Sequence, residues 1–101
     1  MTDRPEVHSI VRHFKKVLFD APSKMFLYEV VAYAVNATND KECVIYRSLG
    51  DYTKIYTRDL DDFNSLVDKQ KYPNCEQEYK FVVVGMFQTD NVTGERYIKY
   101  Y

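Results

Sequence analysis

Apolar runs separated by turn-forming clusters occupy the middle of the chain, and this pattern predicts three strands followed by a short helix. The run Leu27–Val35 is rich in β-branched and aromatic residues and stops at the polar cluster Asn36–Asp40, which is typical of a hairpin. The partner strand is expected over Glu42–Leu49 and a third strand over Lys54–Thr57. A helix is expected over Asp59–Phe63, with its first aspartate as the cap and its acids at the positive end of the dipole.

The segment before these strands carries two conflicting patterns. Apolar residues of Glu6–Phe19 recur at spacings of three and four, which indicates an amphipathic helix. The turn-like Asp20–Lys24, with Pro22 inside it, separates two apolar runs and favours extended chain on either side. We expect a helix or an irregular lead-in first and a strand near Val17, and residues 6–19 stay open between helix and strand.

The end of the chain predicts a second hairpin. After a polar loop over Lys69–Glu78 comes the most apolar run, Tyr79–Phe87, in which Gly85 indicates a bulge. The turn formers up to Gly94 connect it to a last strand over Arg96–Tyr101. Residues 79–101 are therefore expected to form a terminal β-hairpin.

Five or six short strands with one or two short helices predict a mainly β (α+β) domain. The economical arrangement is a strongly bent antiparallel sheet that closes into a small barrel, because closure removes exposed strand edges. The 101 residues suffice for a single domain over 1–101. A hydrophobic content of 46% and a net charge of -1 exclude a disordered polyelectrolyte and a strongly basic protein that binds nucleic acid by overall charge.

The sequence contains neither a membrane segment nor a cofactor signature. No apolar run approaches the length of a bilayer span, and the N-terminus lacks the order of a signal peptide, so we expect a cytoplasmic protein that does not enter membranes. Cys43 and Cys75 lack the spacing of a zinc site and are expected to be free thiols. No phosphate-binding glycine loop is present, and no cofactor is expected.

Several segments, in this order, resemble a family of small bacterial and phage proteins, catalogued as domain of unknown function 1653. The segments are His13–Lys15, Tyr28–Val31, Val44–Asp51, Ile55–Phe63, Tyr72–Asn74 and Gln77–Phe81. The resemblance covers about residues 11–81. It implies an SH3-like small β-barrel and no established activity.

The chain also departs from the family pattern. It inserts a segment around Asp20–Lys24, and it has Tyr56 and Asp59 where the family usually has tryptophan and proline. The tail from Val82 onward lies outside the pattern. The insertion and the terminal hairpin could reshape or cover a surface that the family uses.

Candidate catalytic and metal-binding residues have simpler explanations. No serine or cysteine stands with a base and an orienting group, so we expect no enzyme. Asp59, Asp61 and Asp62 lack the spacing of a calcium loop and are explained by the helix dipole. His13 with Arg12 and Lys15 could present a basic spot to an anion, although ordinary solvated side chains are the simpler interpretation.

The tyrosines are the most informative feature of the composition. The chain has ten tyrosines and no tryptophan. On the central strands Tyr28, Tyr46 and Tyr56 fall where alternate residues share a face, with Arg47 and Arg58 next to two of them. Such a surface could stack a base or nucleotide while an arginine meets its phosphate, or it could dock a partner peptide. In the alternative, the tyrosines line the interior, and the arginines pair with acids, namely Asp51, Asp59 or Asp61.

Two functional hypotheses follow from these surfaces. The first is a non-catalytic module that recognises a nucleotide or nucleic acid; its candidate residues are Tyr28, Tyr46, Arg47, Tyr56, Arg58 and His13. The second is a protein-interaction module, such as a phage-encoded inhibitor of a host protein, or a homodimer joined through the terminal hairpin. Its candidate residues are Val83, Met86, Phe87, Tyr97 and Tyr100.

Overall fold

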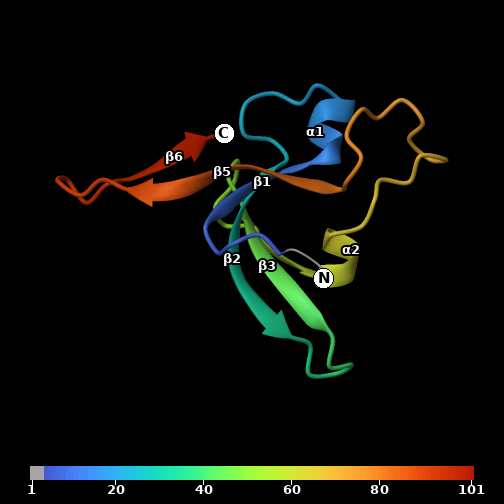
Figure 1. Ribbon diagram of the computed structural model, residues 1–101, viewed down its shortest axis with the longest axis horizontal. Coiled ribbons are helices and arrows are strands. Elements are labelled where there is room, and N and C mark those ends of the chain that lie inside the picture. The colour runs from blue at the N-terminus through green and yellow to red at the C-terminus, as the bar shows by residue number, and fades with distance from the viewer. Residues whose placement is uncertain (1–3) are drawn as a thin grey trace.

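A single six-stranded antiparallel sheet with two short helices forms the molecule (Figure 1). The computed structural model describes residues 4–101. The strand order in the sheet is β4-β3-β2-β1-β5-β6. The elements are β1 Ser9–His13, α1 Phe14–Leu18, β2 Leu27–Val35, β3 Glu42–Ser48, β4 Ile55–Asp59, α2 Leu60–Phe63, β5 Phe81–Thr89 and β6 Arg96–Tyr100.

This architecture confirms a mainly β fold, the three central strands and the terminal hairpin. The closed barrel is not confirmed: in the described residues the sheet has two edges, β4 and β6, and does not close on itself. Within residues 4–101, no helix is long and apolar enough to cross a membrane. Cys43 and Cys75 are free, as predicted, and both are buried.

The prediction for Glu6–Phe19 has its two elements in the wrong order. The strand β1 comes first, and Val17 lies in the helix α1. β1 pairs with β2 on one side and β5 on the other, and both Ile10 and Val11 are fully buried. A central strand that is buried on both faces loses its alternation of polar and apolar residues, so the helical spacing is misleading here.

The helix α2 is confirmed, but its predicted cap is not. Asp59 occupies the N-cap position without a hydrogen bond from its side chain to the helix. It is also the last residue of β4, where it pairs with Cys43. Asp61 and Asp62 lie in the first turn, as the dipole argument predicts.

The sheet separates two apolar clusters. One face buries the first cluster, whose members are Val11, Val30, Val44, Tyr46, Phe63 and Phe81. The other face buries Ile10, Leu27 and Leu49, against which Phe87 and Ile98 of the hairpin pack. A side chain of the central strands therefore belongs to one cluster or the other according to its parity.

The bulge predicted at Gly85 is confirmed beside that residue. Ile10 pairs with Gly85, but the next residue, Val11, pairs with Val83, so that Val84 is the extra residue. A Cβ atom on Gly85 would lie 2.6 Å from the carbonyl oxygen of Lys99. Glycine is needed here because β6 approaches the backbone so closely.

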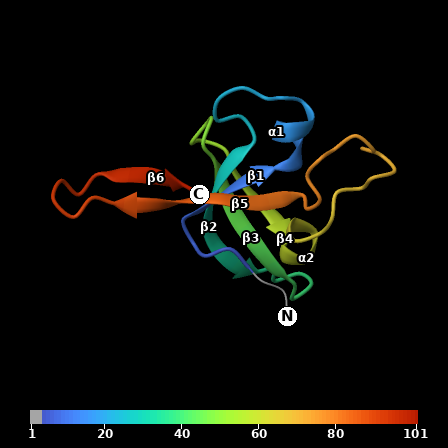
Figure 2. The ribbon, with the colours of Figure 1, turned by 45° about the horizontal axis from the view of Figure 1, so that its top comes forward.

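The hairpin of β5 and β6 extends away from the rest of the molecule (Figure 2). The hairpin is tied to β2 by Glu29, a carboxylate that is almost fully buried. Oε2 of Glu29 lies 2.8 Å from Arg96 Nη2 and 2.8 Å from His8 Nδ1. Arg96 also stacks over the ring of Phe87, with 4.2 Å between guanidinium carbon and ring centroid.

Candidate functional site

Three tyrosines from adjacent strands meet on the face of the first apolar cluster. Tyr46 of β3 is the direct partner of Tyr56 in β4, and Tyr28 lies two residues before Val30, the partner of Tyr46 in β2. The centroid of the Tyr28 ring is 5.2 Å from that of Tyr46 and 5.9 Å from that of Tyr56. The centroids of the Tyr46 and Tyr56 rings are 5.6 Å apart. The sequence prediction that these three share a face is confirmed.

These rings line a pocket of about 200 Å³, which we call the tyrosine pocket. It is lined by His13, Lys15, Phe26, Tyr28, Tyr46, Tyr56, Arg58 and Phe81. The rings differ in what they offer to a ligand, since Tyr56 is 41% exposed while Tyr46 is 4% exposed. Tyr56 thus provides an open aromatic surface, and Tyr46 supports it from below.

Arg58 is held in place from three sides. Its Nε donates to the Tyr46 hydroxyl at 3.2 Å, and its Nη1 donates to Asp62 Oδ2 at 2.6 Å. Its guanidinium carbon lies 5.3 Å from the centroid of the Phe81 ring. Burial alone would lower the pKa of Arg58, but the hydrogen bonds to Tyr46 and Asp62 outweigh burial and raise it. Arg58 is therefore a fixed cation with a defined orientation.

Asp62 joins Arg58 to a second cation. Its other oxygen, Oδ1, accepts from Lys80 Nζ at 2.6 Å. These hydrogen bonds, first from Lys80 and then from Arg58, lower the pKa of the Asp62 carboxyl. The pairing with Asp62 also corrects the alternative from the sequence, which assigned Asp51, Asp59 or Asp61 as partners of the arginines.

His13 is a buried, neutral member of the tyrosine pocket. Its Nδ1 accepts a hydrogen bond from the backbone N–H of Lys15 at 3.2 Å and so caps α1. Burial, together with the positive charges of Arg58, Lys15 and Lys80, lowers the pKa of His13 to about 4. Because Nδ1 is an acceptor, the proton of the neutral ring sits on Nε2, which is thereby a hydrogen-bond donor.

A second pocket of about 310 Å³ shares three lining residues with the first, and we call it the lysine pocket. It is lined by His13, Phe14, Lys15, Arg58, Asp68, Lys71, Tyr72 and Lys80. The ring centroids of Phe14 and Tyr72 lie 5.0 Å apart, which fixes the loop after α2 against α1. Four cations and one carboxylate line this pocket, so it favours an anion.

A wider hollow, of about 640 Å³, continues the aromatic surface on its other side. It shares Phe26, Tyr28 and Tyr56 with the tyrosine pocket and reaches from them to the inserted segment and the turn between β3 and β4. The exposed ring of Tyr56 is therefore accessible from two directions.

Two predicted site residues lie elsewhere. Arg47 follows Tyr46 directly in β3, so its side chain projects from the opposite face, and its register partner is Glu29. Arg12 precedes His13 and donates to the side-chain oxygen of Gln77 at 3.0 Å. The structure therefore brings Tyr28, Tyr46, Tyr56, Arg58 and His13 together and excludes Arg47.

The hairpin residues proposed for partner binding do not form one patch. Val83, Tyr97 and Tyr100 are exposed, whereas Met86 and Phe87 are half-buried. Phe87 belongs to the second apolar cluster and lies under Arg96. Since Met86 and Phe87 are neighbours in β5, their side chains lie on opposite faces. A contact through this hairpin would have to use its edge or one face only.

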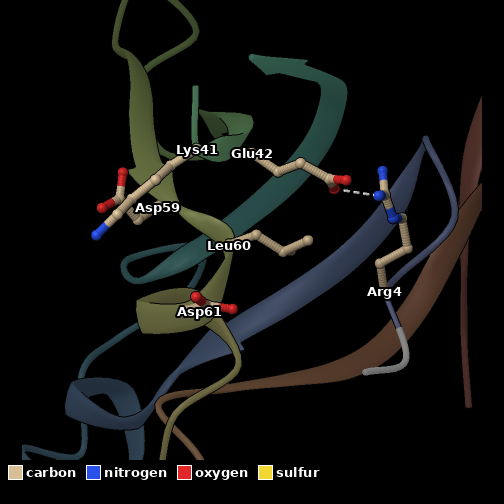
Figure 3. Close-up of a pocket in the computed structure, with 6 residues that line it drawn as sticks. All are labelled: Arg4, Lys41, Glu42, Asp59, Leu60 and Asp61. Atoms are coloured by element: carbon tan, nitrogen blue, oxygen red, sulfur yellow. Dashed lines mark hydrogen bonds and ion pairs between the residues drawn. The ribbon is translucent and has the colours of Figure 1, made fainter. Parts of the chain in front are cut away.

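Another hollow, of about 370 Å³, lies beside the start of α2 (Figure 3). It is lined by Arg4, Lys41, Glu42, Asp59, Leu60 and Asp61. Arg4 and Glu42 form an ion pair across it, and its charges are of mixed sign. No aromatic ring of the described residues lines it. Within residues 4–101 no group of three or more histidines, cysteines or acids could hold a metal ion.

A family model described as Protein of unknown function (DUF1653) matches residues 9–83. The chain belongs to this family. No curated protein and no solved structure matches the chain. The DUF1653 match runs through all residues that line the tyrosine and lysine pockets, and it leaves most of the terminal hairpin outside.

The DUF1653 segments and the tyrosine pocket coincide closely. Of the residues that line this pocket, only Phe26 lies outside the segments through which the sequence resembles the family. Phe26 follows the inserted segment Asp20–Lys24, none of whose residues lines this pocket; Pro22, Ser23 and Lys24 line the neighbouring wider hollow. Segments far apart in the sequence thus converge on one pocket.

Phe81, Lys71 and Lys80 are members of the site that were not predicted from the sequence. Phe81 is the first residue of β5, Lys80 directly precedes it, and Lys71 lies in the loop after α2. The signal that could have found Phe81 is its position in a family-like segment. No local pattern marks Lys71, because only the packing of its loop on α1 places it at the pocket.

Proposed function

We propose that this protein is a non-catalytic binding module that recognises a nucleotide, free or within a single-stranded nucleic acid, through the tyrosine and lysine pockets. The observation that carries the proposal is the continuity of the two pockets through His13, Lys15 and Arg58. An aromatic surface directly beside a cationic hollow matches the two chemically different parts of a nucleotide.

The base is accommodated on the tyrosine side. Tyr56 offers a half-exposed ring on which a flat heterocycle can stack, and stacking tolerates any base. Burial, followed by the neighbouring Tyr46 and Tyr56, raises the pKa of Tyr28 to about 12, so its hydroxyl stays neutral. The Nε2–H of neutral His13 adds a donor for a base or sugar oxygen.

The phosphate is accommodated on the lysine side. Lys15, Lys71 and Lys80 line this pocket, and Arg58 stands between it and the tyrosines. The planar guanidinium of Arg58 suits bidentate contact with phosphate oxygens. The pockets, of about 200 and 310 Å³, are together in the range of small-molecule sites, roughly 300–1,000 Å³.

The fold proposal from the family resemblance accords with this site. We propose that the part of the sheet from β4 to β5 is an open version of an SH3-like barrel, in which the bent strands β2, β3 and β4 carry the tyrosines. The terminal strand β6 is then an addition beyond the family-like part.

The test is calorimetric titration with nucleoside monophosphates, the matching nucleosides and a short single-stranded oligonucleotide. We expect the monophosphates to bind more tightly than the nucleosides. Arg58→Ala should weaken monophosphate binding by about tenfold or more, since a charge-assisted hydrogen bond contributes about 1.5–3 kcal/mol.

Arg47→Ala is the matched control, because Arg47 adjoins Tyr46 in β3 and so projects from the opposite face of the sheet. This change removes the same charge from the protein as Arg58→Ala, but it should leave the affinity for the monophosphates unchanged. If neither the monophosphates nor the oligonucleotide bind, or if the two arginine variants lose affinity equally, the proposed function is wrong.

A further inference from the structure

The outer edge of β6 has the geometry to pair with a second copy of this chain. β6 is the last strand of the sheet, so in the described part of the chain one of its two edges has no neighbouring strand. The backbone N–H of Tyr101 donates to the carbonyl of Val84 at 2.9 Å, and that of Asp90 donates to the carbonyl of Glu95 at 2.8 Å. These two pairs fix which residues of β6 bond to β5.

Hydrogen-bonded pairs alternate along an antiparallel ladder. In the register of β5 and β6, the hydrogen-bonded residues of β6 are therefore Tyr97 and Lys99, between Glu95 and Tyr101. The other three residues of the strand direct their N–H and C=O groups outward. These three are Arg96, Ile98 and Tyr100.

We propose that this edge is the seam of a homodimer in which two β6 strands pair antiparallel about a twofold axis at Ile98. In this register Ile98 faces the partner's Ile98, and Arg96 faces the partner's Tyr100. All three outward residues then fall in hydrogen-bonded pairs on both copies. The proposal is independent of the nucleotide site, whose tyrosines lie on β2, β3 and β4.

The sequence of β6 is self-complementary in this register. Arg96 meets a tyrosine, and Tyr97 meets the partner's Lys99 in a close, non-hydrogen-bonded pair. No two like charges of the paired strands face each other directly. A cation beside an aromatic ring is favourable, and exposed Tyr97 and Tyr100 supply such rings.

The shape of the molecule leaves room for this contact. The hairpin extends away from the rest of the molecule (Figures 1 and 2), and in the described residues the outer edge of β6 has no neighbouring strand. A twofold pairing closes after two copies, which gives a dimer and no longer assembly. Because a seam of five-residue strands is small, the dimer should form in a concentration-dependent way.

The test compares Ile98→Pro with Ile98→Ala by sedimentation velocity over a range of protein concentrations. Both variants lose the isoleucine side chain, but only proline removes the outward N–H, which β5 does not use. We expect the mass of the parent and of Ile98→Ala to double with concentration and that of Ile98→Pro to stay monomeric. A parent that stays monomeric, masses beyond a dimer, or equal dimerisation of both variants would overturn the proposal.

Hydrogen exchange of the parent protein gives a second test that needs no variant. The amides of Arg96, Ile98 and Tyr100 should become protected as the concentration rises, whereas those of Tyr97 and Lys99 are protected throughout. A dimer that forms without new protection at these three amides uses another surface, and the proposed seam is then wrong.

Discussion

Each face of the sheet carries a cluster of a histidine, a carboxylate and an arginine, and the two clusters are built in opposite ways. On the hairpin face the carboxylate of Glu29 is 4% exposed, and its partners His8 and Arg96 are about half exposed. On the pocket face His13 is buried, while Asp62, the partner of Arg58, is 43% exposed. In the first cluster the carboxylate is the buried member, whereas in the second cluster the histidine is the buried member.

The difference in burial between the carboxylates Glu29 and Asp62 indicates that the two clusters have different roles. A buried carboxylate that contacts both His8 and Arg96 fastens the hairpin to β2, and loss of that carboxylate leaves Arg96 without its ion pair. An exposed carboxylate beside Arg58 and Lys80 holds these cations ready, and an incoming anion can compete with it. We expect the first cluster to matter for stability and the second for binding.

The largest effect on stability is expected from Glu29→Ala. This change removes two charge-assisted hydrogen bonds, so the free energy of unfolding should fall by roughly 2–3 kcal/mol, since Arg96 and His8 are partly solvated. Urea denaturation measures the loss, and hydrogen exchange should locate it in β6. The control Glu95→Ala, at the exposed hairpin turn, should change stability little. A Glu29 variant as stable as the parent would contradict the structural role.

A smaller change in the free energy of unfolding than that of Glu29→Ala is expected from the titration of His13. The pKa of His13 is about 4 in the folded protein and 6.5 in its ordinary state, so between these values the unfolded chain binds more protons. Stability should therefore fall as the pH drops from 6.5 towards 4, by roughly 1–2 kcal/mol between pH 7 and pH 5.

His13→Asn tests this expectation, because asparagine keeps an acceptor for the cap of α1 but does not titrate. Denaturation at pH 7 and pH 5 should show a smaller loss in the variant than in the parent. Equal losses in the two proteins would mean that His13 is not the group responsible.

The central strands and the tyrosine face could be predicted from the sequence, because their pattern is local. Leu27–Val35 and Glu42–Leu49 flank a clear turn, and alternation places Tyr28, Tyr46 and Tyr56 together. The same alternation excludes Arg47, which directly follows a tyrosine of the face. Neighbours along a strand point to opposite faces, so the position of Arg47 next to Tyr46 in β3 places it away from the tyrosines.

The strand β1, the lysine pocket and the open sheet depend on long-range contacts, which a local sequence pattern does not predict. The residues of β1 show a helical spacing because burial on both faces removes the alternation of a strand. Lys71 and Lys80 reach the lysine pocket only through the packing of a loop on α1 and the start of β5. The spacing of strands along the sequence also does not tell whether the sheet closes; the structure shows that β4 and β6 are edge strands and that the sheet stays open.

The smallest loss of stability is expected from Asp62→Asn, and this change is also expected to strengthen the binding of nucleoside monophosphates. Hydrogen bonds from Lys80 and Arg58 lower the pKa of Asp62 below its ordinary 3.8, so its stabilising contribution is present above that pH and is lost as the pH falls. Because the carboxylate is 43% exposed, its removal should cost less than about 1 kcal/mol. Loss of its charge should strengthen nucleoside monophosphate binding roughly two- to fivefold in calorimetric titration, because the carboxylate no longer competes with the phosphate.

The control for this change is Asp61→Asn, one residue earlier and exposed, which should leave the affinity for monophosphates unchanged. The two variants remove the same charge from the same helix, so a gain confined to Asp62→Asn must come from the contacts of Asp62 with Arg58 and Lys80. If Asp62→Asn instead destabilises the protein as much as Glu29→Ala, the contrast between the two clusters fails, and Asp62 is a structural residue like Glu29.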